Sequence, residues 1–75
     1  MSIEIFNDFG KVLAKVYEKT VSVYTDGPED INCIYLYDYT KNKEVEVDSD
    51  VYNITERDLY WYALEYFQAE ELNYH

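Results

Sequence analysis

The sequence predicts an α+β domain in which a small three-stranded antiparallel sheet is flanked by N- and C-terminal helices, in the order α-β-β-β-α. Two patterns and the length of the chain indicate this fold class. Apolar residues recur at helical spacing near both ends of the chain and alternate with polar residues in its middle. A length of 75 residues allows one domain, residues 1–75.

The first predicted element is a helix over residues 3–19. Its apolar residues follow helical spacing: Ile5, Phe9, Val12, Leu13, Val16 and Tyr17. Ser2 is a suitable N-cap, and three lysines fall on the opposite side of this helix. Gly10 disfavours a helix interior by about 1 kcal/mol relative to alanine. A hairpin that turns at residues 7–10 is therefore the alternative for this segment.

Two strands are predicted next, joined by a turn. Residues 20–26 alternate valine with polar side chains, which is typical of a strand. Residues 26–30 (DGPED) combine glycine, proline and aspartate, the residues that tight turns favour. Residues 31–40 are rich in β-branched and aromatic side chains, and we expect them to form the central strand.

The third predicted strand is the acidic stretch KEVEVDSD, residues 43–50. Alternate side chains of a strand point to the same face. The pattern therefore predicts that two valines face the core and that four carboxylates form a row on the other face. These carboxylates belong to Glu44, Glu46, Asp48 and Asp50.

The chain closes with a predicted helix. Thr55 is a suitable N-cap, and Asp58 occupies the position of a capping-box acid. Residues 59–72 contain neither glycine nor proline, and aromatic residues occur nearly all round this helix. Such a helix suits an element that packs on a sheet and still offers apolar side chains on its outer flank.

Charge is the strongest indication of function class. Sixteen Asp and Glu residues against six Lys and Arg residues give a formal net charge of −10. This exceeds the net magnitude of about 2–8 that keeps a small domain soluble. It argues against direct binding to nucleic acid or to an anionic membrane surface and favours a partner with a basic surface. Ten tyrosines, three phenylalanines and one tryptophan argue against disorder despite the charge.

The single cysteine and the lack of targeting segments predict a cytoplasmic protein. Cys33 excludes an intrachain disulfide, and its apolar surroundings predict a small buried hydrophobe. No signal peptide and no apolar stretch of about 18 residues is recognisable.

Catalytic and metal-binding signatures are missing from the sequence. The single histidine is the last residue, His75, and chain ends are poor places for a rigid catalytic relay. Residues 48–59 begin like a calcium loop, but Leu59 stands where that loop needs a bidentate glutamate. We therefore predict a protein that is not an enzyme and needs no metal or cofactor.

Carboxylates and exposed aromatic residues are the candidate binding groups. Tyrosine and tryptophan are enriched at protein interfaces because they offer stiff contact area with a polar tip. A solvated acidic surface and tyrosines buried in the core are the alternative interpretation. The predicted partner-binding residues are Asp26, Glu29, Asp30, Tyr35, Tyr37, Asp38, Tyr39, Glu44, Glu46, Asp48, Asp50, Tyr60 and Trp61.

The chain resembles small acidic inhibitors that phages and prophages direct against host DNA-handling enzymes. The matching features are an amphipathic N-terminal segment, strands joined by the polar turns TDGPED and TKNK, and an acidic segment before a closing aromatic helix. By pattern, most of the chain is similar to type II-A anti-CRISPR proteins of Listeria prophages.

This resemblance implies a DNA mimic in the host bacterial cytoplasm that occupies the basic cleft where an RNA-guided nuclease reads its PAM. The four carboxylates of residues 43–50 would then replace phosphates or base-edge acceptors. Restriction endonucleases, uracil-DNA glycosylase and histone-like proteins are equally basic targets. The sequence thus predicts an inhibitor that occludes the basic site of a host defence or DNA-processing protein. The alternative is a tyrosine-rich interaction or homodimerisation module whose acidity serves solubility.

Overall fold

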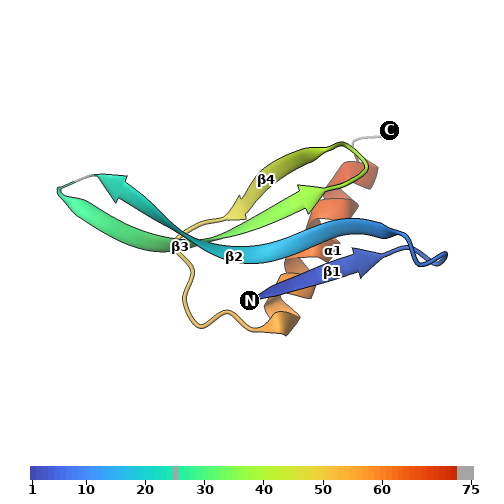
Figure 1. Ribbon diagram of the computed structural model, residues 1–75, viewed down its shortest axis with the longest axis horizontal. Helices are drawn as coiled ribbons and strands as arrows, with labels where there is room; N and C mark the ends of the chain where they lie inside the picture. Colours follow the sequence, from blue (N-terminus) through green and yellow to red (C-terminus); the bar gives the residue numbers. More distant parts are fainter. Residues whose placement is uncertain (25, 73–75) are drawn as a thin grey trace.

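The computed structural model describes the backbone of residues 1–24 and 26–72, and the side chains of these ranges up to residue 68. It shows a four-stranded antiparallel sheet with one helix behind it (Figure 1). The elements are β1 (Ser2–Phe6), β2 (Val12–Tyr24), β3 (Pro28–Asp38), β4 (Lys43–Asp48) and α1 (Glu56–Leu72). The strands lie in the sheet in chain order, so each pairs with its neighbour in the sequence. The predicted three-stranded sheet with helices at both ends is therefore wrong.

The N-terminal segment is the hairpin of β1 and β2 and not a helix. Asn7 organises the turn, because its side-chain Oδ1 accepts hydrogen bonds from the N–H groups of Phe9 (2.9 Å) and Lys11 (3.0 Å). Gly10 has a φ of +80°, a conformation that glycine adopts without steric strain. The alternative reading of residues 7–10 as a turn is correct.

Helical spacing was misleading here because β2 carries apolar residues on both of its faces. Ala14 and Val16 are fully buried in the core. Leu13 and Tyr17 point to the other face of the sheet and are half-buried. A strand with two apolar faces loses its polar–apolar alternation, so its apolar residues also match a helical period.

The other predicted strands exist with different bounds. Residues 20–24 of the first predicted strand are the end of a longer strand, β2, and the central strand β3 begins at Pro28 and not at residue 31. Glu29 and Asp30, which we expected in a turn, therefore belong to β3. β4 ends at Asp48, two residues before the predicted end of the third strand.

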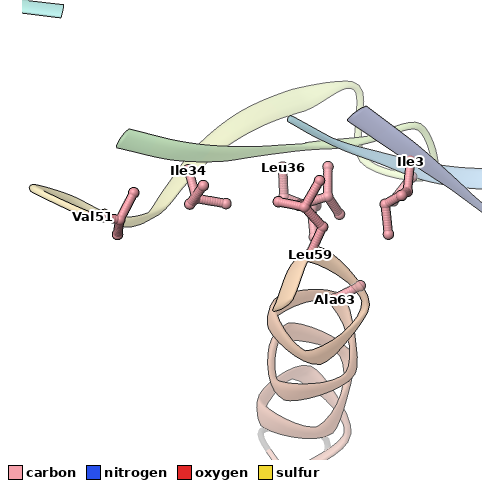
Figure 2. Packing of buried hydrophobic residues seen from close by; sticks show 8 residues of the cluster. Ile3, Ile34, Leu36, Val51, Leu59 and Ala63 are labelled. Carbon is pink, nitrogen blue, oxygen red and sulfur yellow. The ribbon is translucent and has the colours of Figure 1, made fainter. Parts of the chain in front are cut away.

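The core lies between α1 and one face of the sheet. Leu59 and Ala63 of α1 point toward side chains of the strands (Figure 2). The buried apolar residues are Ile3, Ala14, Val16, Ile34, Leu36, Val51, Leu59 and Ala63. Three aromatic residues of α1 pack against this core from the helix side: Tyr62, Tyr66 and Phe67. In the described part of the chain, no helix or strand covers the opposite face of the sheet.

The start of α1 has the predicted capping box. The N–H and the hydroxyl of Thr55 donate to Oδ2 of Asp58 at 2.9 and 3.0 Å. In return, the N–H of Asp58 donates to the Thr55 hydroxyl oxygen at 3.3 Å. These reciprocal bonds satisfy donors that the first turn of a helix leaves free.

β2 and β3 extend well beyond the rest of the sheet as a two-stranded arm (Figure 1). β1 pairs with β2 only up to Tyr17, and β4 pairs with β3 only as far as Ile34. The arm therefore consists of residues 19–24 and 28–33, and it contributes to a molecule 46 Å long.

Candidate functional site

The face of the sheet turned away from α1 is the candidate binding surface, and we call it the open face. Strand register places its residues in rows across the sheet. One row contains Glu4, Lys15, Tyr37 and Glu44, and the next contains Ser2, Tyr17, Tyr35 and Glu46. Two central aromatic strands are thus flanked by strands that carry carboxylates.

Half-buried tyrosines form the middle of the open face. The rings of Tyr17 and Tyr35 stack with centroids 5.9 Å apart and an interplanar angle of 19°. Tyr37 and Tyr39 are also in contact, with centroids 4.9 Å apart. The Nζ atom of Lys19 lies 5.5 Å from the centre of the Tyr35 ring, within the range of a cation–π interaction.

Burial and the carboxylates of β4 raise the pKa of the neighbouring tyrosines. Burial, followed by a hydrogen bond to Glu44, raises the pKa of Tyr17 to about 12. Burial and the nearby charge of Glu46 also raise the pKa of Tyr35. Both phenols therefore keep their protons at neutral pH, and both lie beside a negative charge.

The predicted row of four carboxylates is broken after Glu46. Glu46 lies opposite Tyr35, but the register then shifts so that Asp48 lies opposite Ile34. This β-bulge adds one residue, Val47, to β4, and an extra residue reverses the face on which later side chains lie. Glu44 and Glu46 share the open face, whereas Asp48 faces α1.

Asp48 and Asp50 have hydrogen-bond partners within the chain. Asp48 accepts from the hydroxyl of Tyr62 in α1 and from the N–H of Ser49. Asp50 has a φ of +53° and accepts from the hydroxyl of Tyr52 at 2.9 Å. Neither aspartate therefore extends the row formed by the two glutamates.

Asp38 is not available to a partner, contrary to the prediction. It is 1% exposed at the end of β3. Its Oδ1 accepts from the N–H and hydroxyl of Thr40 and from the N–H of Lys41, and its Oδ2 accepts from the hydroxyl of Tyr66. Burial works against the charged form, but these hydrogen bonds outweigh it and lower the pKa of Asp38. This carboxylate is a structural group that links β3 to α1.

The remaining predicted residues lie on two other surfaces. Glu29 and Asp30 are exposed on the arm, and Asp26 is exposed in the turn at its end. Tyr60 and Trp61 are both 53% exposed on α1, on the side away from the core. The structure therefore brings Tyr35, Tyr37, Tyr39, Glu44 and Glu46 together on the open face and leaves the other candidates apart from them.

Sequence reasoning missed Tyr17, because this residue was assigned to the apolar side of a helix. The alternation of Lys15, Tyr17 and Lys19 with Val16 could have revealed it, since this order places the three side chains on one face of a strand. Cys33 is 1% exposed, as predicted for a small buried hydrophobe, and lies on β3 outside the core cluster.

Other kinds of site find little support in the described residues. Among them, no three His, Cys, Asp or Glu side chains are grouped to hold a metal ion. A shallow pocket between β4 and α1 is lined by Val47, Tyr62, Glu65 and Tyr66, and both of its tyrosine hydroxyls already donate to aspartates. The described residues contain no helix with the length and apolar character that a membrane span needs. His75, which the sequence analysis considered as a catalytic residue, lies outside the described residues.

Comparison with known proteins finds no matching protein family, no similar curated protein and no similar solved structure.

Proposed function

We propose that this protein is a non-enzymatic binding protein that attaches to a basic surface of another protein and blocks that surface. The observation that carries the proposal is the pairing of Glu44 and Glu46 with the tyrosines of the open face. The carboxylates attract basic side chains, and the tyrosines provide stiff apolar contact area. The net charge of −10 adds long-range attraction to any basic surface.

A protein that handles nucleic acid is the partner class that fits this chemistry. Such proteins expose basic clefts to bind phosphates, so an acidic protein competes with the nucleic acid for the same cleft. Inhibition of a host defence or DNA-processing enzyme, in the cytoplasm of a bacterium, is the biological form of this proposal. Because the acid row contains two carboxylates and not four, the open face would rely on its tyrosines as well as its charge.

A pull-down followed by a binding measurement tests the proposal. The immobilised protein is incubated with bacterial lysate, and bound proteins are eluted with a salt gradient, identified and purified. We expect a basic nucleic-acid-binding protein whose association slows with salt and which duplex DNA displaces. Retention of no basic protein, or a partner indifferent to both salt and DNA, would contradict the proposal.

Paired variants locate the contact on the purified partner. The double variant Glu44→Gln/Glu46→Gln removes two charges from the open face while keeping an acceptor for Tyr17. Glu56→Gln/Glu65→Gln removes the same charge from α1 and serves as the control. We expect clearly slower association for the first pair than for the second, since charges at the contact steer the encounter in addition to the net charge.

A second candidate function is homodimerisation through the open face, and one observation favours it. The half-buried apolar side chains do not end with the tyrosines but continue along the arm through Val21, Val23 and Ile31. Sedimentation at low and high salt separates the two functions. A dimer that is insensitive to salt supports this second candidate, and an acidic monomer supports the first.

A further inference from the structure

The arm presents two strand edges that no other strand covers in the described part of the chain. β1 stops at the level of Tyr17, and β4 stops at the level of Ile34. A two-stranded ribbon is marginally stable alone, and an uncovered strand edge is a template for a further strand. A further strand can pair only with an edge of the arm that is not protected.

Backbone direction identifies the hydrogen-bonding groups on the β2 edge. The N–H of Glu18 donates to the carbonyl of Met1, so this residue directs its backbone groups toward β1. Alternate residues of a strand point their backbone groups to the same side. Thr20, Ser22 and Tyr24 therefore direct their N–H and C=O groups outward, beyond the end of β1.

The pairing within the arm agrees with this assignment. Tyr24 lies opposite Pro28, which has no N–H group and is tolerated only where a strand bond is not required. Ser22 lies opposite Asp30, and its hydroxyl donates to Oδ1 of Asp30 at 2.8 Å. Side chains approach each other this closely at pairs that exchange no backbone hydrogen bonds.

The β3 edge of the arm is protected, and the β2 edge is not. On the β3 edge, Pro28 offers no donor and the carbonyl of Asn32 already accepts from the N–H of Val51 at 3.0 Å. On the β2 edge, residues 20–24 read TVSVY, with no charge and no proline. Exposed strand edges commonly carry charges, proline or bulges that prevent pairing, and this edge lacks all three.

We propose that residues 20–24 of β2 bind an extended, basic segment of the partner protein as an additional strand of the sheet. The proposal rests on the proposed function in taking the partner to be basic. Carboxylates surround the edge: Glu18 and Asp26 lie near its ends, and Glu29 and Asp30 lie on the strand behind it. Like Ser22 and Thr20, Glu18 and Asp30 are on the α1 side of the sheet.

The two faces of the arm define the sequence that such a segment needs. On the α1 side it would lie near the carboxylates of Glu18 and Asp30, so alternate residues should be lysine or arginine. On the open face it would lie beside the half-buried Val21 and Val23, so the intervening residues should be valine, isoleucine or threonine. Backbone bonds supply affinity and these alternate side chains supply specificity.

A second copy of this chain fits the edge less well. Two copies that pair antiparallel across residues 20–24 must have Ser22 opposite its own counterpart. In that register Glu18 of each copy lies near the turn that carries Asp26 of the other. These like charges repel each other, in addition to the repulsion between two chains of charge −10.

Hydrogen exchange on the unmodified protein is the first test. The probe is a ten-residue synthetic peptide in which lysine alternates with valine or threonine, and the control peptide has glutamate in place of lysine. With the lysine peptide, we expect exchange at the N–H groups of Thr20, Ser22 and Tyr24 to slow by about tenfold or more. The N–H groups of Val21 and Val23, which point toward β3, are internal controls and should change little.

A proline variant tests the same edge by removing one outward donor. Ser22→Pro deletes an N–H group that β3 does not use, and Ser22→Ala is the matched control because both variants lose the bond to Asp30. We expect about tenfold weaker peptide binding for Ser22→Pro than for Ser22→Ala, with both variants folded by circular dichroism. If Ser22→Pro does not fold, the hydrogen-exchange measurement on the unmodified protein still shows whether the β2 edge binds the peptide.

The outcomes separate this inference from the proposed function. Absence of lysine-peptide binding, or binding without protection of Thr20, Ser22 and Tyr24, overturns the strand-addition proposal and leaves the Glu44 and Glu46 experiment unaffected. Equal binding of the glutamate peptide overturns the basic character of the segment. Self-association without peptide that Ser22→Pro abolishes would show that a second copy occupies the edge.

Discussion

The hydroxyl of Tyr66 donates a hydrogen bond of 2.8 Å to Oδ2 of Asp38, which joins the third turn of α1 to the end of β3. Four residues earlier on the same side of the helix, the hydroxyl of Tyr62 donates to Asp48 at the end of β4. These two bonds hold α1 against both strands that flank the turn between β3 and β4. The orientation of α1 is therefore fixed by polar contacts as well as by the apolar core.

Removal of the Tyr66 hydroxyl should destabilise the fold. Tyr66→Phe leaves a buried carboxylate with one donor fewer, and we expect a loss of about 1–3 kcal/mol in the free energy of unfolding. Urea denaturation measures this loss. Tyr62→Phe is the matched control, because Asp48 is exposed to water, and we expect a loss at the low end of about 0.5–1.5 kcal/mol. Equal losses in the two variants would contradict the structural role of Asp38.

The lowered pKa of Asp38 predicts weaker folding in acid. In the unfolded chain an aspartate titrates near pH 3.9, and the folded value is lower because the hydrogen bonds favour the charged form. A group whose pKa is lower in the folded state stabilises the fold above the unfolded value. This stabilisation is lost as the pH falls through the folded value.

Comparison with Asp38→Asn isolates this effect from the other carboxylates, which titrate in both proteins. We expect the difference in unfolding free energy between the original protein and the variant to be constant above about pH 5 and to shrink below about pH 4. Urea denaturation from pH 2.5 to 7 gives the two curves. A difference that stays constant down to the lowest pH would mean that Asp38 is not the group responsible.

Local signals in the sequence were sufficient to predict where α1 begins. Thr55 and Asp58 are three residues apart, and the capping box needs no information from elsewhere in the chain. Placement of tyrosines on one face of β3 also follows from alternation alone, and Tyr35 and Tyr37 are on the open face together. Features of this kind depend only on neighbours along the chain.

Features that depend on contacts between distant parts of the chain could not be predicted from the sequence. The bulge at Val47 arises where β4 meets Ile34 and Tyr35, and nothing within KEVEVDSD indicates it. The burial of Asp38 depends on Tyr66, which is 28 residues away. The extended arm is likewise a property of where β1 and β4 end. The expected acid row lost Asp48 because the bulge changed its face, and it lost Asp50 because β4 ends before that residue.

The side of α1 that faces the sheet leads to a prediction about two leucines. Leu59 is fully buried, whereas Leu64 is 56% exposed. We expect Leu59→Ala to lower the free energy of unfolding by about 2–5 kcal/mol, because it leaves a cavity in the core. Leu64→Ala should change it by about 0.5 kcal/mol at most, since an exposed side chain leaves none. Similar losses measured by urea denaturation would show that α1 packs differently.

The phenol of Tyr62 should titrate at unusually high pH. Its hydrogen bond to Asp48, followed by burial, raises its pKa to about 12. Because the pKa is higher in the folded state than the value of about 10 in an unfolded chain, this phenol stabilises the fold fully below about pH 10. The stabilisation is lost as the pH rises through about 12, so the protein should unfold more easily in strong alkali.

Phenolate absorbance measured from pH 8 to 13 tests this titration. The difference between the original protein and Tyr62→Phe gives the curve of the single missing phenol, and we expect its midpoint near pH 12. Asp48→Asn is the control for the cause: without the charged acceptor, the midpoint of Tyr62 should move down toward about 10, the ordinary value. A missing phenol that already titrates near its ordinary value in the original protein would show that Tyr62 does not donate to Asp48 in solution. In that case the attachment of α1 to β4 would depend on apolar contacts alone.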